Sequence, residues 1–440
     1  MPDIEVYKRL LCRGVAEVII EQELIRLLEL GEKLRLKQGF DPSRPDIHLG
    51  HVVGLRKLRQ FQELGHQVIL IVGDWTAQIG DPSGESATRP MLSAAEVRAN
   101  AETYMKQFFK VVDKDKTKVV WQSEWFGKFT LADVISLTAK FTVAQMLQRD
   151  DFAKRYVAGR PIAITELLYP LLQAYDSVVV EADVEFGGTD QKFNCLVGRE
   201  LQQMVGQHPQ QVFLVPLLVG TDGSQKMSKS LGNYIAVDES PGDMYGKVMS
   251  VPDGLMMDYY ELLTDVPDNE LADMKADLAK QSINPMIPKK RLAREIVAQF
   301  HDKKAAVAAE AEFERVVQRR EIPDGIDEFR ISFKKLQTEA AARLAEARRS
   351  GVVEGDNEYV ITEVGNAKKG ELQVDYLSVP VPFLLSKVGF VSSNSEARRL
   401  LAQRAVEIDG TTVIEGAAKI KNGSVIKVGK RRFVRIVDAD

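Results

Sequence analysis

The apolar positions in the first part of the chain alternate between helical and strand-like spacing. Ile4 to Leu30 has helical spacing, and a short strand-like run follows from Leu34 to Phe40. His48 to Leu64 returns to helical spacing and ends at Gly65, and Gln67 to Gly73 is an apolar run typical of buried parallel strands. This order of strand, loop, helix and strand predicts a doubly wound α/β sheet.

The same alternation continues to about residue 219 and then stops. We expect further strands at Lys118 to Gln122, Val178 to Val184 and Val212 to Val219, with a helix from Asp190 to Val205. From Asp243 to about Ala347 the pattern is helical and rich in Ala, Glu, Lys and Arg. The expected fold class is α/β, with a Rossmann-like doubly wound parallel sheet followed by a helical second domain.

Two further segments follow the helical region. The stretch from Gly351 to Lys369 is polar, contains several glycines and has weak periodicity, so we interpret it as part of a linker. A small α+β module comes after it. The expected boundaries are residues 1–240 for the sheet domain, 241–350 for the helical domain, 351–378 for the linker and 379–440 for the last module.

The composition is that of an ordinary globular protein. Of the 440 residues, 45% are hydrophobic and 28% are charged. The apolar runs are shorter than the roughly 18 residues that a membrane-spanning helix needs, and no secretory signal is visible. Cys12 and Cys195 are too few for a disulfide framework and fit a reducing compartment. We therefore expect a cytoplasmic protein with no membrane passage.

Charge is distributed unevenly along the chain. Between Pro380 and Asp440, eleven Lys and Arg stand against six Asp and Glu, which gives +5. The whole chain has 59 basic and 63 acidic residues, so the remainder has 48 and 57, or −9. A basic module on an acidic body indicates a polyanionic partner for that module.

Two of the five histidines lie in the tetrapeptide His48-Leu49-Gly50-His51, at the start of an expected helix. A helix N-terminus offers unpaired backbone N–H groups, and two imidazoles can donate hydrogen bonds to phosphate oxygens. Gly50 has no side chain to block a close approach. A surface pair or part of a metal site are the alternatives, but no Cys or further His lies nearby, so no metal site is expected.

A glycine-flanked loop follows the strand expected at Val212 to Val219. It contains Lys226-Met227-Ser228-Lys229-Ser230, in which two lysines supply compact positive charges for a triphosphate or a departing pyrophosphate. A solvated lysine loop is the alternative for this composition alone.

Together the two motifs resemble the two signatures of class I aminoacyl-tRNA synthetases, usually written HIGH and KMSKS. The second is identical here, and the first reads HLGH. The resemblance implies ATP as a magnesium complex, with no metal bound by the protein itself. It implies that Ser43 and His48 contact the leaving pyrophosphate, that His51 lies at the ATP ribose, and that Lys226 and Lys229 stabilise charge on the triphosphate.

Two further segments resemble tyrosyl-tRNA synthetases: Tyr169 to Asp176, which reads YPLLQAYD, and Gly187 to Gln191, which reads GGTDQ. In this family a tyrosine, a glutamine and an aspartate at this spacing line the amino-acid pocket, which by match are Tyr169, Gln173 and Asp176. Spacings of four and three place them on one helix face. An aspartate that accepts from the substrate phenol explains how phenylalanine is refused, and this enzyme class is itself the standard example of that discrimination.

The other site residues follow by match to the same family. Asp81 matches the aspartate that holds the substrate ammonium, Gln191 lies near the substrate carboxylate, and Asp190 accepts from a ribose hydroxyl. The resemblance places further ATP contacts at Asp41, Gly50, Gly188, Met227 and Lys229. An exposed helix face for Gln173 and Asp176, and a helix N-cap for Asp190, are the alternatives.

One departure from the family concerns the substrate phenol. One branch has a second tyrosine that reads this group, and the corresponding position is Lys37 here. That contact is therefore missing or is supplied differently, and the sequence is closer to the other bacterial branch.

The last module resembles the small RNA-binding module shared by ribosomal small-subunit protein four and bacterial tyrosyl synthetases. Ser393 and Glu396 have the spacing of a capping box, and Val406 to Gly410 reads as a strand and turn. A basic solvated face is the alternative. The residues expected to contact tRNA phosphates are Arg398, Arg399, Arg404, Arg431 and Arg432.

These resemblances imply a tyrosine–tRNA ligase that forms tyrosyl-adenylate from L-tyrosine and ATP and transfers tyrosine to tRNA(Tyr). They also imply a homodimer and an anticodon-side role for the helical domain. The rivals are the tryptophan-specific sister enzyme, a nucleotidyltransferase with a related His-x-Gly-His, and a non-catalytic RNA-binding or splicing protein. The tryptophan enzyme predicts a different pocket sequence. The nucleotidyltransferase predicts that the KMSKS loop is absent, and the non-catalytic protein predicts that the signature residues are lost.

Overall fold

The structure is a computed structural model that describes residues 4–43, 46–82, 92–318, 326–335, 377–414, 416–429 and 432–440. The chain divides into two compact units, Met1–Glu310 and Ala311–Asp440. The linker expected at 351–378 lies outside the described residues except for its last two positions. In the described ranges, no helix is long and apolar enough to cross a membrane.

The first unit is built on a six-stranded sheet with the order β1-β6-β5-β2-β3-β4. Its five parallel strands are β2 (Arg35–Phe40), β3 (Gln67–Val72), β4 (Thr117–Trp121), β5 (Val184–Gly188) and β6 (Gln211–Val215). At one edge, β1 (Glu17–Ile19) pairs antiparallel with β6. The strand order reverses between β2 and β5, the position at which doubly wound sheets bind ligands beyond their carboxyl ends. The expected Rossmann-like fold is confirmed.

Helices lie on both faces of this sheet. The helices of this part of the chain are α1 (Ile4–Cys12), α2 (Glu21–Glu29), α3 (Leu49–Glu63), α4 (Thr76–Ile79), α5 (Ala94–Phe108), α6 (Ser123–Phe126), α7 (Leu131–Thr138), α8 (Val143–Met146), α9 (Asp150–Val157), α10 (Ile164–Val179) and α11 (Lys192–Met204). Alternate side chains of β2 face opposite sides. Gln38 lies beside Gly54 of α3, whereas Lys37 bonds to Ser177 of α10. The ends of β2 and β5 thus lie between α3 and α10.

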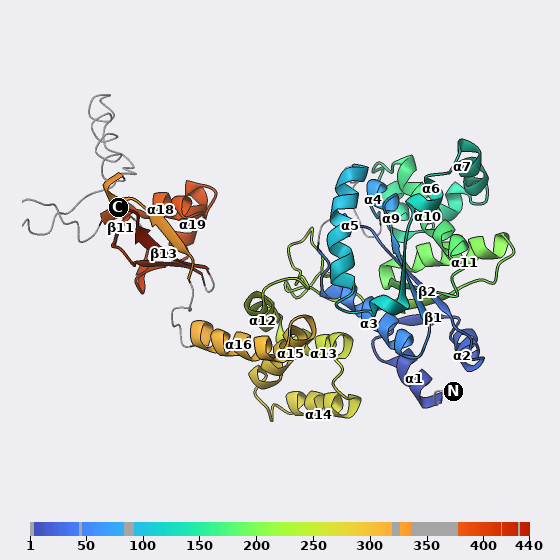
Figure 1. Ribbon diagram of the computed structural model, residues 1–440, viewed down its shortest axis with the longest axis horizontal. Helices are drawn as coiled ribbons and strands as arrows, with labels where there is room; N and C mark the ends of the chain where they lie inside the picture. The colour runs from blue at the N-terminus through green and yellow to red at the C-terminus, as the bar shows by residue number, and fades with distance from the viewer. Residues whose placement is uncertain are drawn as a thin grey trace, which may run out of the picture. The chain divides into compact units, whose positions relative to one another are not determined.

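A helical group follows the sheet (Figure 1). Its helices are α12 (Pro241–Ser250), α13 (Met256–Leu263), α14 (Asp268–Ala279), α15 (Met286–Phe300) and α16 (Lys303–Phe313). Short helical turns lie at η1 (Lys114–Lys116), η2 (Thr189–Gln191), η3 (Asp253–Leu255) and η4 (Glu314–Gln318). Arg13, just after α1, donates to the carbonyl oxygens of Tyr260, Thr264 and Val266, which ties the N-terminal segment to this group.

The pattern was misleading at three places in the first unit. The segment from Ile4 to Leu30 contains two helices and the edge strand β1 rather than one helix. The strand expected at Val178 to Val184 is wrong, because its first apolar residues form the last turn of α10 and β5 begins only at Val184. β6 ends at Val215, since Pro216 has no N–H for the ladder.

The second unit contains a five-stranded sheet with the order β10-β9-β12-β13-β7 and a separate β8–β11 pair. Its strands are β7 (Glu328–Ile331), β8 (Leu377–Pro380), β9 (Val406–Ile408), β10 (Thr411–Val413), β11 (Ala417–Ile420), β12 (Val425–Val428) and β13 (Arg432–Asp438). Two helices, α18 (Val381–Lys387) and α19 (Asn394–Ala402), pack with them around one apolar core.

Strand β7 is a correction to the expected helical region. Residues 328–331 pair parallel with β13, in a part of the chain where the pattern predicts helix. Phe329 and Ile331 alternate with Glu328 and Arg330 and pack against the core of the second unit. This period of two is too short a signal to stand out between helical segments.

Candidate active site

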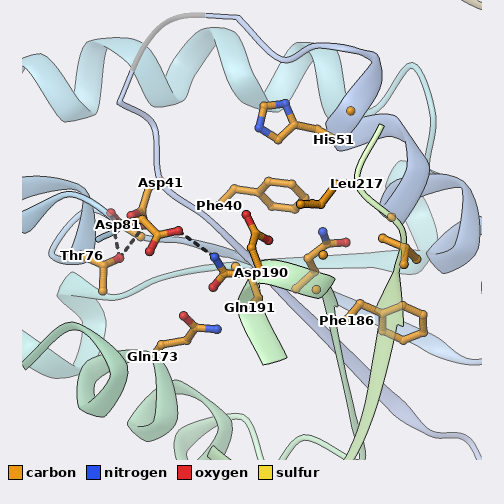
Figure 2. Close-up of a pocket in the computed structure, with 18 of the residues that line it drawn as sticks. Phe40, Asp41, His51, Thr76, Asp81, Gln173, Phe186, Asp190, Gln191 and Leu217 are labelled. Atoms are coloured by element: carbon orange, nitrogen blue, oxygen red, sulfur yellow. Dashed lines mark hydrogen bonds between the residues drawn. The ribbon is translucent and has the colours of Figure 1, made fainter. Parts of the chain in front are cut away.

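A cavity of about 310 Å³ opens at the carboxyl ends of β2 and β5 (Figure 2). Most of the expected catalytic, ATP and tyrosine residues line it: Asp41, Ser43, His48, Gly50, His51, Asp81, Tyr169, Gln173, Asp176, Gly188, Asp190, Gln191, Lys226 and Met227. Lys229 is not among the lining residues. Figure 2 shows Asp190 and Gln191 between His51 on one side and Gln173 on the other.

The two signature histidines are held in one tautomer by the start of α3. Nδ1 of His48 accepts from the amide of Gly50 at 3.2 Å, and Nδ1 of His51 accepts from the amide of His48 at 3.1 Å. A neutral imidazole that accepts at Nδ1 carries its proton on Nε2. A Cβ at residue 50 would lie 3.0 Å from the His48 ring, so this stacked arrangement favours glycine there.

Burial keeps both rings neutral. Loss of solvent, helped by the charge of Lys229, lowers the pKa of His51 to about 3 and the pKa of His48 well below its usual value of 6.5. The two imidazoles, 3.9 Å apart between ring centres, are therefore neutral Nε2–H donors at the cavity wall.

The lysine loop is folded around Asn233. The Asn233 amide donates to Asp222 at 2.8 Å and accepts from the backbone of Ser228 at 2.8 Å. From this loop, Lys226 Nζ donates to Asp190 at 2.9 Å, while Lys229 Nζ donates to the hydroxyl of Tyr104 at 2.7 Å. Lys226 thus faces the cavity in this state, and Lys229 rests on α5.

Asp176 lines the cavity and is 2% exposed. Its carboxylate accepts from Gln122 Nε2 at 2.8 Å and from Trp125 Nε1 at 3.2 Å. Burial raises the pKa of Asp176 to about 7, against the opposing charge of Lys37 and the two hydrogen bonds. A buried carboxylate held by fixed donors suits an acceptor for one further hydroxyl.

Tyr169 is fixed from the opposite side by Asp41. The Tyr169 hydroxyl donates to Asp41 Oδ2 at 2.8 Å, and Thr76 Oγ1 donates to Asp41 Oδ1 at 2.7 Å. Burial and the Asp41 charge raise the pKa of Tyr169 well above its usual value, so the phenol stays protonated. Asp41 therefore lines the cavity as the acceptor that orients Tyr169.

Lys37 is directed away from the cavity. Its Nζ, fully buried, donates to Glu185 at 2.8 Å, to Ser177 Oγ at 2.7 Å and to the carbonyl oxygen of Gln173 at 2.8 Å. Glu185 also accepts from Gln173 Nε2 at 3.1 Å. Lys37 thus supports the helix that carries the pocket residues, and it is absent from the lining.

Several residues around the cavity were missed by the sequence reasoning: Thr76, Gln122, Trp125 and Glu185. Gln122 directly follows β4, and residues at that position meet at the carboxyl edge of a parallel sheet. That placement is the signal that would have found it. Glu185 carries no such signal, because its importance depends on its pairing with Lys37 across two strands.

The residues expected to contact tRNA lie in the second unit. Arg398 and Arg399 are on α19, and Arg404 follows it. Arg432 donates to the carbonyl oxygen of Phe390 at 2.7 Å. Arg431 lies outside the described residues. Ser393 caps α19 as expected, but the Glu396 carboxylate bonds to Ser392 in place of the reciprocal bond to Ser393.

Among the residues that the structure describes, no group of three His, Cys, Asp or Glu is placed to hold a metal ion. The positively charged and N–H groups around the cavity point to binding of an anionic ligand. The carboxylates at its other end suit hydroxyl and ammonium groups.

Comparison with known proteins gives a consistent result. The family described as class I tRNA synthetases (W and Y) matches residues 29–318. The tyrosine–tRNA ligase of Dehalococcoides mccartyi (strain CBDB1) is 58% identical over 98% of both chains, and that of Thermotoga maritima is 46% identical over 97% of this chain and 96% of its own. The structure of tyrosyl-tRNA synthetase complexed with L-tyrosine from Archaeoglobus fulgidus has a TM-score of 0.57 at 25% identity, and it covers 70% of this chain and 100% of its own.

The matched region contains the whole cavity, from β2 to the lysine loop. With this extent of identity over its full length, the chain belongs to the class I tRNA synthetases and, within them, to the tyrosine–tRNA ligases.

Proposed function

We propose that the cavity at the ends of β2 and β5 carries out both steps of the tyrosine–tRNA ligase reaction. The carboxylate of L-tyrosine attacks the α-phosphorus of ATP in line, which forms tyrosyl-adenylate and releases diphosphate. The tyrosyl group then passes to the 3′ end of tRNA(Tyr), and AMP is released. The attacking carboxylate is already ionised, so the first step needs no general base and depends on positioning and charge stabilisation.

The ATP end of the cavity lies at α3 and the lysine loop. Neutral His48 and His51 donate from Nε2 to the nucleotide, together with Ser43, and Lys226 and Lys229 neutralise the triphosphate. When the nucleotide binds, Asp190 releases Lys226 and accepts a hydrogen bond from a ribose hydroxyl. Magnesium enters with ATP as part of the substrate. Asp41, Gly50, Gly188 and Met227 complete the wall.

The tyrosine end lies at α10. Asp176 accepts from the substrate phenol, Asp81, Tyr169 and Gln173 hold the ammonium group, and Gln191 faces the carboxylate. The observation that carries this proposal is the buried Asp176, whose donors Gln122 and Trp125 are fixed. A phenylalanine ring in that place would leave a buried carboxylate short of one partner.

The decisive experiment is amino-acid-dependent exchange of radiolabelled pyrophosphate into ATP. Tyrosine should support rapid exchange, and tryptophan and phenylalanine should not. Exchange that depends on tryptophan, or no exchange with any of the three, contradicts the proposal.

A homodimer is supported by exposed apolar side chains on three helices of the first unit. Leu131, Val157 and Ile164 are 75%, 86% and 80% exposed, and they come from α7, α9 and α10. We infer that these side chains belong to the dimer interface, where contact with the partner would bury them. Val157→Glu should convert the dimer to a monomer in sedimentation analysis, whereas a wild-type mass near 49.1 kDa contradicts the dimer.

The remaining parts of the chain are assigned to tRNA. The helical group within 241–350 serves the anticodon side, and the module at 379–440 binds RNA through Arg398, Arg399, Arg404, Arg431 and Arg432. The net charge of +5 on that module supports this assignment. The free thiols of Cys12 and Cys195 support a cytoplasmic location.

A further inference from the structure

A line of buried and partly buried hydrogen bonds runs from outside the cavity to its amino-acid end. Arg149, 5% exposed, forms two bonds with the Asp151 carboxylate at 2.7 and 2.6 Å and donates to Asn194 Oδ1 at 3.2 Å. Asn194 Nδ2 donates to Gln191 Oε1 at 3.0 Å. Gln191 Nε2 then donates to Asp81 at 2.7 Å, a bond drawn in Figure 2.

The chemistry of Arg149 determines the direction of every bond in this line. A guanidinium has only donors, so it must face the oxygen of the Asn194 amide. The Asn194 nitrogen is then turned to Gln191 and must meet its oxygen. Gln191 in turn presents its nitrogen to Asp81, and the second N–H on that nitrogen remains for a ligand.

We propose that Arg149 and Asn194 are positioning residues that hold the Gln191 amide with its N–H groups toward Asp81 and the substrate carboxylate. This inference rests on the proposed function, because it concerns the amino-acid end of the same cavity. Neither residue lines the cavity, so both act through Gln191.

The opposite orientation of Gln191 is strongly disfavoured while the line is intact. It would place Oε1 against the Asp81 carboxylate and Nε2 against the Asn194 nitrogen. Because Asn194 is fully buried, water cannot relieve the mismatch between the two amide nitrogens. The second mismatch, between Oε1 and the Asp81 carboxylate, brings two acceptors together at the cavity lining. The free protein is therefore already arranged to receive a carboxylate beside an ammonium group.

Asn194→Asp tests the direction of the bonds at nearly constant volume. The new carboxylate still accepts from Arg149 but has no donor for Gln191, so Gln191 must turn its oxygen to Asp81 and the ligand. We expect the dissociation constant for tyrosine to rise by about 10-fold or more, as for a mispaired buried hydrogen bond. The KM for ATP should stay within about twofold.

Two comparisons separate orientation from general damage. Asn194→Ala leaves a void but no mispaired acceptor, so its effect on tyrosine binding should be smaller than that of Asn194→Asp. Tyramine, which has no carboxylate, should lose less affinity than tyrosine in Asn194→Asp. Gln202→Glu makes the same chemical change at a buried amide on the same helix and should leave tyrosine binding within about twofold.

Equal losses for tyrosine and tyramine, or a larger effect of Asn194→Ala, would overturn the inference in favour of a packing role. Unchanged tyrosine binding in Asn194→Asp would also overturn it. Failure of the proposed function is distinguished by the wild-type chain, which would then show no tyrosine-dependent pyrophosphate exchange.

Discussion

At the residue scale, the ligand preference of the cavity depends on whether each lining side chain is held as a hydrogen-bond donor or as an acceptor. His48 and His51 are donors because the backbone occupies their Nδ1 atoms and burial prevents a second proton. Asp176 is an acceptor with two fixed donors. In the proposed reaction, the histidine donors suit an anionic nucleotide and the Asp176 acceptor suits the phenol of tyrosine.

The donor role of His48 predicts an unusual pH dependence. His48→Asn should retain part of the adenylate-forming activity that His48→Ala loses, since an amide can still donate. In an NMR titration, neither signature histidine should titrate near pH 6.5, because both pKa values lie well below that value. Their contribution to stability is present above about pH 6.5 and is lost as the pH falls, because the unfolded state then binds more protons. A histidine titration near pH 6.5 that controls the rate would contradict this role.

Replacement of Asp176 should abolish discrimination as well as activity. Asp176→Ala removes the proposed phenol acceptor, so the ratio of tyrosine to phenylalanine in pyrophosphate exchange should fall by on the order of 10³-fold or more. Persistent discrimination would mean that the phenol is read elsewhere. Tyr175→Phe, a neighbour that does not line the cavity, is the control and should leave the ratio unchanged.

Lys229 should matter for the transition state more than for the resting complex. In this state it is bonded to Tyr104, away from the cavity lining. Lys229→Ala should lower the single-turnover rate of tyrosyl-adenylate formation by on the order of 10²-fold, while tyrosine binding barely changes. Tyr104→Phe, which removes only the resting contact, should have a far smaller effect on the rate. A normal rate with weakened tyrosine binding would reverse the assignment.

At the element scale, the site is made where four elements meet. The carboxyl ends of β2 and β5 supply its floor, the start of α3 supplies the histidines, and α10 supplies Tyr169, Gln173 and Asp176. The Lys37–Glu185 pair joins β2 to β5 and holds Gln173 of α10 through both its carbonyl oxygen and its amide. This contact sets the position of α10 against the sheet.

This buried pair predicts strongly non-additive substitutions. Lys37→Met alone leaves Glu185 buried without its cation and should destabilise the first unit by about 3–5 kcal/mol. The double variant Lys37→Met/Glu185→Met removes both charges and should recover much of that loss. Urea unfolding of the wild type, Lys37→Met, Glu185→Met and the double variant measures the coupling, and simple additivity would show that the pair is energetically independent.

At the scale of the whole molecule, the two units have separate cores and separate proposed tasks. The cavity lies within the first unit, and the basic residues assigned to tRNA lie in the second. Because β7 pairs with β13, a truncated chain that lacks the whole second-unit sheet must end before residue 328. A chain truncated at the start of the basic module would keep β7 but lose its partner strand β13.

A chain that ends at Gln318 should therefore keep tyrosine-dependent pyrophosphate exchange but aminoacylate tRNA poorly. Its tRNA binding should depend less steeply on salt, by roughly one unit of slope for each phosphate that the shortened chain no longer neutralises. The full chain with Arg398→Gln and Arg399→Gln tests the same arginines without truncation. Equal charging rates and equal salt slopes for all three chains would leave the basic module as a solvated face.

The order of elements in the sheet domain, the positions of both signatures and the family all follow from the amino-acid sequence alone. These features depend on local periodicity and on short motifs, and both can be recognised within a single segment of the chain. Local patterns gave a wrong prediction at Val178 to Val184, where the apolar residues at the end of α10 have the spacing of a strand. They also missed the short strand β7, which lies in a region where the pattern predicts helix.

The orientation of the site residues, in contrast, is set by the packed tertiary structure. Lys37 and Glu185 are 148 residues apart in the chain, and Gln191 and Asp81 are 110 apart. Local spacing cannot specify which donor meets which acceptor across such separations, because that choice depends on burial and on the limited number of hydrogen-bonding partners in the packed interior. The neutral histidines, the raised pKa of Asp176 and the bonds that lead to Gln191 all arise from that packing.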